Sequence, residues 1–219
     1  MDIEKNIHDY IYGDNSSQGI QPLERYASFD YCFNYFQSFQ EQGRISELAS
    51  SSHLHESCLH LGFYLASWGM LRGSSFLLGK SVKVYEALIR TIVNANPILW
   101  EIDVNCYTPE NIRLILDFRK TIQENLNYGN GASDILVTKI MLGVFGNVPA
   151  FDTNFKNGFG VSTFGKSALE KISSFYEANS IIIENSRLAT LDFMTGQSTN
   201  RLYTRAKVID MVFFIEGGK

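Results

Sequence analysis

The residues best able to do chemistry lie in one run near the middle of the chain, GNGASDILVTKIMLGVFGNVPAFDTNF. Gly129 and Gly131 begin it, and a Gly-x-Gly turn permits positive φ and a close approach of the backbone. The helix expected just after the turn leaves several backbone N–H groups exposed together, which suits a phosphate. Asp152 follows Gly131 by 21 residues. This carboxylate is the best candidate in the chain for acid–base or cation-stabilising chemistry.

The two charged residues of most interest in this run also have structural interpretations. Asp152 precedes an expected helix, and aspartate commonly caps a helix N-terminus. A capping carboxylate stays oriented and ionised, so capping and catalysis are compatible. Lys139 lies on a mostly apolar helix. Its side chain either extends along the helix edge to solvent or enters a pocket.

A second run, WGMLRG at positions 68–73, offers two pocket candidates. Trp68 can stack on a base, and Arg72 can donate hydrogen bonds to a base or a phosphate. Trp68 also continues an apolar helix face, which favours a place in the core. Arg72 stands between two glycines and has no packing explanation.

Helical periodicity predicts the elements that must position these residues. The helix before the glycine turn begins at Thr108 and Pro109, which suit the N-cap and the first helical position, and it ends near Tyr128. The helix after the turn begins at Ser133 and runs to about Phe145. Further helices are expected over 54–68, 81–96, 166–186 and 203–215, and another begins around Asp152. Alternating strands and hairpin signals are missing from the sequence, so we expect an all-α fold.

The order of these features resembles the helix-hairpin-helix DNA glycosylase superfamily, of the endonuclease III and adenine glycosylase type. There, a Leu-Pro-Gly-x-Gly hairpin is followed one helix later by a Pro-x-x-Asp-[Thr/Gly]-[His/Asn] element that holds the catalytic aspartate. The matching residues here are Gly129 and Gly131 in the hairpin, and Pro149, Asp152, Thr153 and Asn154 in the second element. The resemblance implies a two-lobed, all-α glycosylase fold that spans 1–219 as one unit, with the hairpin and the aspartate within about 108–165.

The resemblance also implies a reaction, hydrolysis of the N-glycosidic bond of a base flipped out of double-stranded DNA to leave an abasic site. Asp152 would stabilise the oxocarbenium-like sugar and orient or deprotonate the attacking water. The residues implied to bind a DNA phosphate, with a monovalent cation at the hairpin, are Gly129, Asn130, Gly131 and Ser133. The residues expected in the base pocket are Lys139, Trp68, Arg72 and Asn154.

Departures from the superfamily pattern refine this expectation. Tyr128 replaces the hairpin proline, and Asn130 replaces a small hydrophobic residue. Ser133 stands where bifunctional members have a Schiff-base lysine, so we expect a monofunctional enzyme without lyase activity. A C-terminal four-cysteine cluster is missing, so no iron–sulfur centre is expected. Such divergence favours a modified base as substrate, for example glucosylated hydroxymethylcytosine in phage DNA, and a role in anti-phage defence.

Three alternatives remain open at this point. The first is a base-excision repair glycosylase that removes damaged bases. The second is a non-catalytic helix-hairpin-helix module that binds DNA and uses Asp152 only as a cap. The third is a helical protein-interaction domain in which the aromatic-rich segment ERYASFDYCFNYFQSF is interface or core.

Composition sets the broad limits. With 45% hydrophobic and 19% charged residues the chain is globular, and it contains no apolar stretch of transmembrane length. Three widely spaced cysteines and an acidic N-terminus favour reduced thiols in the cytoplasm over a secreted protein. The net charge is −4, but bases outnumber acids over 156–207, where we expect a polyanion to bind. The histidines at 53, 55 and 60 do not share a helix face, so we expect no metal site. We also expect the protein to be a monomer.

Overall fold

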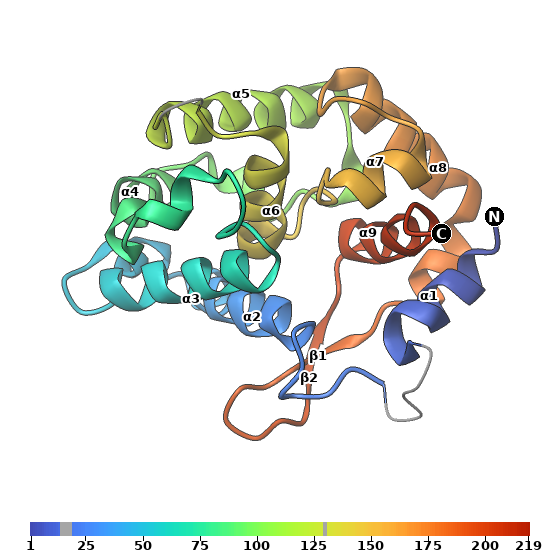
Figure 1. Cartoon of the computed structure of the whole chain (residues 1–219), viewed down its shortest axis with the longest axis horizontal. Helices are drawn as coiled ribbons and strands as arrows, with labels where there is room; N and C mark the ends of the chain where they lie inside the picture. Colours follow the sequence, from blue (N-terminus) through green and yellow to red (C-terminus); the bar gives the residue numbers. More distant parts are fainter. Residues whose placement is uncertain (14–18, 129–130) are drawn as a thin grey trace.

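The computed structural model of the chain describes residues 1–13, 19–128 and 131–219, and helices dominate them (Figure 1). The α-helices are α1 (Ile3–Tyr12), α2 (Ala27–Glu41), α3 (Leu54–Ser67), α4 (Glu86–Val93), α5 (Pro109–Asn125), α6 (Asp134–Phe145), α7 (Thr153–Phe159), α8 (Lys166–Asn185) and α9 (Arg205–Glu216). Short 3-10 helices add η1 (Ile45–Ala49), η2 (Phe76–Gly79), η3 (Val82–Tyr85), η4 (Pro97–Trp100) and η5 (Val104–Cys106). The mostly helical character expected from the sequence is confirmed.

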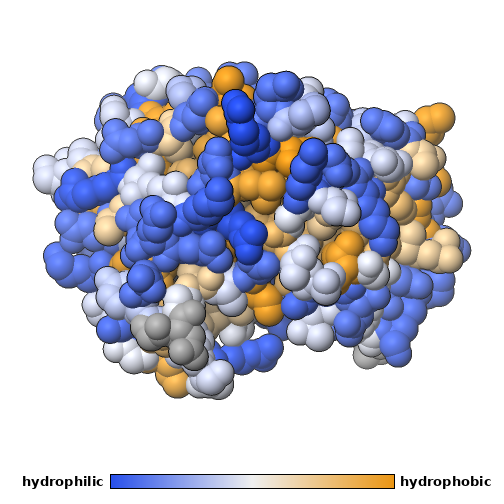
Figure 2. Space-filling view, turned by 90° about the horizontal axis from the view of Figure 1, so that it is seen from above, coloured by the Kyte–Doolittle hydropathy of each residue, from blue (hydrophilic) through white to orange (hydrophobic). Residues whose placement is uncertain are grey.

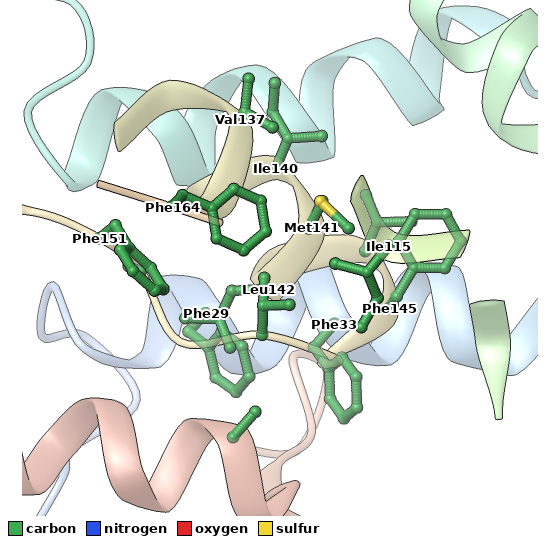
Figure 3. Close-up of a cluster of buried hydrophobic side chains, with 14 of the residues drawn as sticks. Phe29, Phe33, Ile115, Val137, Ile140, Met141, Leu142, Phe145, Phe151 and Phe164 are labelled. Atoms are coloured by element: carbon green, nitrogen blue, oxygen red, sulfur yellow. The ribbon is translucent and has the colours of Figure 1, made fainter. Parts of the chain in front are cut away.

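Helix α6 occupies the centre of the molecule. Figure 1 shows α2 to α5 on one side of it and α1, α7, α8 and α9 on the other. Every residue from Leu136 to Phe145 is buried, so α6 is covered around its whole circumference, and most of these residues are apolar. Phe29 and Phe33 of α2 and Phe151 from the loop after α6 pack in the same cluster (Figure 3). The helix that carries Lys139 is therefore held from all sides.

The helix boundaries around the glycine turn agree closely with the sequence prediction. Thr108 caps α5, and its Oγ1 accepts a hydrogen bond from the Asn111 N–H at 3.2 Å. Ser133 caps α6, and its Oγ accepts a hydrogen bond from the Leu136 N–H at 3.3 Å. Helix α5 ends at Asn125, three residues earlier than the prediction near 128. Over 81–96, the first turn is the 3-10 helix η3, and α4 follows it.

The expectation of no strand pair is wrong. Strands β1 (Ala189–Leu191) and β2 (Ser198–Leu202) form a two-stranded antiparallel sheet between α8 and α9. Their sequences lack an alternating apolar pattern. Hydrogen bonds with side chains of α2 hold the sheet in place. The Leu191 N–H donates to Asp30 Oδ2 at 2.8 Å, and Asn34 Nδ2 donates to the Leu191 carbonyl at 2.9 Å. The expected helix over 203–215 begins two residues later, at Arg205.

The aromatic-rich segment predicted as interface or core forms α2, and most of its aromatic rings are core. Phe29 and Phe36 are fully buried, and Phe33 is nearly so. A helix over this segment was not predicted, because its aromatic residues obscure the helical period. Seen from above, the surface is mainly hydrophilic, with apolar residues gathered near the middle (Figure 2). Among the described residues, no helix combines the length and the apolar character that a membrane span requires.

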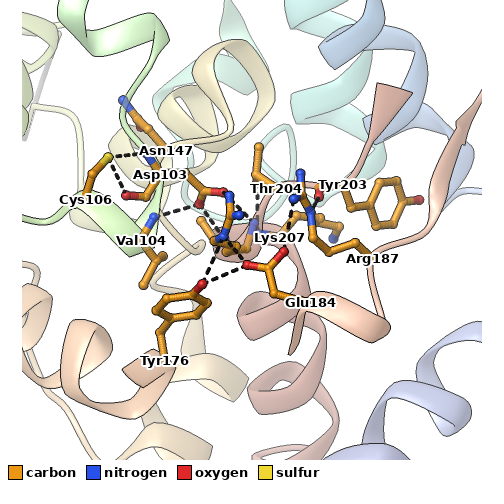
Figure 4. Close-up of polar contacts among 12 residues, drawn as sticks. Asp103, Val104, Cys106, Asn147, Tyr176, Glu184, Arg187, Tyr203, Thr204 and Lys207 are labelled. Carbon is orange, nitrogen blue, oxygen red and sulfur yellow. Dashed lines mark hydrogen bonds and ion pairs between the residues drawn. The ribbon is translucent and has the colours of Figure 1, made fainter. Parts of the chain in front are cut away.

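A polar cluster fixes the start of α9 against α8 (Figure 4). Arg205 lies 3.2 Å from Asp103 Oδ2 through its Nη1 and also pairs with Glu184. Tyr176 donates to Glu184 Oε1 at 2.7 Å. Asp103 further accepts the backbone N–H groups of Arg205 and Ala206 at 2.8 and 3.0 Å. This cluster orients α9, which carries the buried charges described below.

Candidate active site

Asp152 is the N-cap of α7, and it also lines a cavity of about 590 Å³. Its Oδ1 accepts a hydrogen bond from the Phe155 N–H at 3.0 Å. Its Oδ2 lies 3.7 Å from Lys139 Nζ. Only 16% of the Asp152 side chain is exposed. The capping interpretation of Asp152 is therefore confirmed. The cap uses Oδ1 and leaves Oδ2 beside Lys139, and a catalytic role for this carboxylate stays a prediction.

Lys139 enters the cavity and does not reach solvent along the helix edge. Its side chain is 6% exposed. The Nζ donates a hydrogen bond to the Trp68 carbonyl oxygen at 2.8 Å. Burial lowers the pKa of Lys139, while the carboxylates of Asp152 and Asp210 act in the opposite direction. A buried amine beside a carboxylate is the most chemically distinctive pair in the cavity.

The loop that carries Asp152 is held by buried side chains from two helices. The Ala150 N–H donates to Asp210 Oδ1 of α9 at 3.0 Å. The Phe151 N–H donates to Thr138 Oγ1 of α6 at 2.8 Å. These two consecutive N–H groups come directly before Asp152, so the backbone on its N-terminal side is fixed before any ligand binds.

Asp210 belongs to a buried ion pair with Lys207, which no sequence motif indicates. Lys207 Nζ lies 3.1 Å from Asp210 Oδ2 and donates to Tyr10 Oη at 2.9 Å. The two residues are 1% and 6% exposed. Burial raises the pKa of Asp210, and Lys207 opposes that rise. Spaced i,i+3 on α9, the pair looks like a surface pair in the sequence, and only the tertiary packing shows its burial.

Trp68 lines the cavity but is packed as part of a stack of rings. It stacks on Tyr26 at 5.4 Å between centroids, and Tyr26 stacks on Tyr10 at 4.5 Å. Lys207 Nζ lies 5.2 Å from the centre of the Trp68 ring. Tyr26 thus covers one face of the indole. This packing supports the core interpretation of Trp68 more than that of an open platform for a base.

Arg72 and Asn154 line the same cavity. Arg72 is exposed, and its guanidinium folds back over Gly69. A Cβ on Gly69 would lie 2.8 Å from Arg72 Nε, and the φ of Gly69 is +78°. The positive φ favours glycine at position 69, whereas the end of the exposed Arg72 side chain can move away from a Cβ. Arg25 also lines the cavity, although it belongs to no sequence motif.

The hairpin expected to bind phosphate is described in part. Gly129 and Asn130 lie outside the described residues. Gly131 has a φ of +75°, and Ser133 is the cap of α6. Both line a second cavity of about 530 Å³ that shares Arg72 with the first. The hairpin residues and the Asp152 cavity therefore adjoin one another.

Metal ligands do not gather in the part of the chain that the structure describes. Over 1–13, 19–128 and 131–219, no group of three or more His, Cys, Asp or Glu side chains could hold a metal ion. His60 instead stacks on Tyr35 at 4.1 Å between ring centroids.

Comparison of the chain with protein-family models, with curated proteins and with solved structures finds no match.

Proposed function

We propose that the chain is a DNA glycosylase that hydrolyses the N-glycosidic bond of a flipped, modified base, with Asp152 as its catalytic carboxylate. The observation that carries this proposal is the gathering of the predicted site residues at one cavity. The residues selected from the sequence as catalytic and pocket residues all line one cavity, and they are Trp68, Arg72, Lys139, Asp152 and Asn154. They come from three separate segments: the region after α3, the middle of α6, and the start of α7 with its cap.

The reaction breaks the bond between C1′ of the sugar and a nitrogen of the base. The base leaves with the bonding electrons, and the positive charge that develops on the sugar is stabilised by a carboxylate nearby. Asp152 Oδ2 supplies the negative charge that stabilises the sugar cation, because Oδ1 accepts the capping hydrogen bond. A water oxygen then forms the new bond to C1′, and Asp152 accepts its proton. Lys139 pairs with the carboxylate and holds it toward the cavity.

Hydrolysis by water leaves the DNA backbone intact, as we expect of a monofunctional enzyme. Ser133, at the position of the Schiff-base lysine in bifunctional members, instead caps α6. Double-stranded DNA is the proposed partner of a monomeric enzyme, and the hairpin binds one phosphate with a monovalent cation. No iron–sulfur centre takes part in this proposal. Glucosylated hydroxymethylcytosine in phage DNA is the proposed substrate.

The test uses purified wild-type protein, Asp152→Asn, and Asp117→Asn as a matched control. Asp117 lies on α5 outside the cavity, and its side chain is 59% exposed. Each protein is incubated with phage DNA that contains glucosylated hydroxymethylcytosine and with duplexes that carry uracil, 8-oxoguanine or alkylated purines. Abasic sites are then converted to strand breaks with hot alkali. We expect breaks with the wild type and the control but not with Asp152→Asn.

The DNA in which breaks appear distinguishes a role in defence from a role in repair, because only the phage DNA contains the glucosylated base. Breaks that form without alkali would contradict monofunctional hydrolysis. DNA binding without any abasic product would contradict the enzyme proposal.

A second candidate function, a non-catalytic DNA-binding module, is favoured by one observation, the regular N-cap geometry of Asp152. In that case Asp152→Asn binds DNA as the wild type does, and neither protein produces abasic sites.

A further inference from the structure

Three cationic side chains lie close to the side chain or backbone of Trp68 and Gly69, at one wall of the cavity. Lys139 Nζ donates to the Trp68 carbonyl oxygen at 2.8 Å. The Arg25 guanidinium carbon lies 5.2 Å from the centre of the Trp68 ring. The Arg72 guanidinium folds over Gly69, within 2.8 Å of the place where a Cβ would be. The three charges thus lie around two consecutive residues.

These cations are not balanced within the cavity. Asp152 is the single carboxylate that the described residues contribute to its lining, and it pairs with Lys139. Within 1–13, 19–128 and 131–219, neither Arg25 nor Arg72 places its guanidinium on a carboxylate or another hydrogen-bond acceptor. Like charges held together cost free energy. Repulsion from Arg72 contributes to the lowered pKa of Lys139, after the larger effect of burial. An anionic ligand would relieve this excess of positive charge.

The two arginines lie toward different neighbours of the cavity. Arg72 also lines the adjoining cavity formed by the hairpin residues Gly131 and Ser133. Arg25 instead also lines a groove on the side of α3, together with Phe63. A ligand in the cavity would therefore meet one guanidinium toward the hairpin and the other toward this groove.

We propose that Arg25 and Arg72 bind the phosphates on the two sides of the nucleotide that enters the cavity. The site then takes a nucleotide within a strand and does not act on a free nucleoside. A guanidinium suits a phosphate because its N–H groups donate two parallel hydrogen bonds. Such contacts fix the position of the strand without reading its sequence. This inference rests on the proposed function, since it names the groups that hold the substrate at that site.

The test measures the salt dependence of DNA binding, which needs no catalysis. The probe is a short duplex with one tetrahydrofuran abasic-site analogue, so the identity of the excised base is not required. For duplex DNA, each phosphate contact contributes about 0.9 to the slope of log K against log salt. We expect Arg25→Gln and Arg72→Gln each to reduce the slope by about 0.9, and the double variant to reduce it by about 1.8. Arg113→Gln is the matched control, because Arg113 is exposed on α5 and does not line the cavity.

The outcomes separate this inference from the function on which it rests. Wild-type slopes in both arginine variants, with Asp152-dependent base excision retained, would overturn the inference alone. Hydrolysis of a free nucleoside at the rate seen with a duplex would also overturn it. A wild-type protein that neither binds nor cleaves any DNA would overturn the proposed function. Both arginines are exposed, so unchanged melting temperatures of the variants confirm that they are folded.

Discussion

The two roles of Asp152 can be separated by comparing Asp152→Asn with Asp152→Ala. Asparagine caps a helix about as well as aspartate, so Asp152→Asn keeps a hydrogen bond to the Phe155 N–H. Alanine cannot cap, and loss of an N-cap costs about 1 kcal/mol. Both variants remove the negative charge near Lys139, so that effect cancels when one variant is compared with the other.

For a chain of this length, 1 kcal/mol corresponds to a shift of about 2–4 °C in melting temperature. We therefore expect Asp152→Ala to melt about 2–4 °C below Asp152→Asn. Activity should follow a different pattern. Removing one preorganised electrostatic group from an active site commonly costs about 10²–10³ in rate. Both variants should show this loss, because asparagine carries no charge to stabilise the sugar cation.

The assay combines thermal melting with the single-turnover rate of abasic-site formation, with Asp117→Asn as control. A wild-type rate in Asp152→Asn together with a lost rate in Asp152→Ala would refute the catalytic role of the charge. Activity would then follow the cap and not the charge, and Asp152 would be a structural residue.

Three further predictions concern buried groups. Burial lowers the pKa of Lys139 below its ordinary value of 10.5, so the native state releases this proton first as pH rises. Between neutral pH and about 10.5 the wild type should therefore gain stability relative to Lys139→Met, as measured by urea unfolding at several pH values. Burial raises the pKa of Asp30 to about 6 from 3.8. The wild type should therefore lose stability relative to Asp30→Asn as pH rises from 3.8 to about 6. A constant difference in unfolding free energy between the two proteins across that window would contradict this. Gly143→Ala should destabilise the protein by about 1–3 kcal/mol, because its Cβ would lie within 2.8 Å of Tyr64 ring atoms; an unchanged urea midpoint would show that the ring moves aside.

The sequence predicted the elements whose signals are local. Thr108 and Pro109 at the start of α5, and Ser133 at the start of α6, are capping signals that depend on a few neighbouring residues. The strand pair could not be predicted in this way, because Asp30 and Asn34, more than 150 residues away, bond to Leu191. Elements held by tertiary hydrogen bonds leave little trace in their own sequence.

The candidate site likewise combines residues that local sequence motifs indicate with residues that only tertiary packing brings together. The glycosylase-like motif selected Asp152 and Asn154, and the run WGMLRG offered Arg72. The structure places all three in one cavity. Arg25 could not be selected, since it belongs to no motif. The neighbouring Tyr26 stacks on Trp68, and the Arg25 guanidinium carbon itself lies 5.2 Å from the centre of the Trp68 ring.

The buried pair of Lys207 and Asp210 gives a reason why the site must be treated as one unit. A buried ion pair is seldom needed for stability, since apolar residues of similar size often replace it without loss. Here, however, Asp210 also accepts the Ala150 N–H, two residues before Asp152. Lys207 in turn contacts the Trp68 ring, and the Trp68 carbonyl accepts the hydrogen bond from the amine paired with Asp152. These contacts form a closed ring that returns to the same carboxylate. The position of Asp152 is thus set from its backbone and its ion-pair partner together, and a change at either buried charge acts on both.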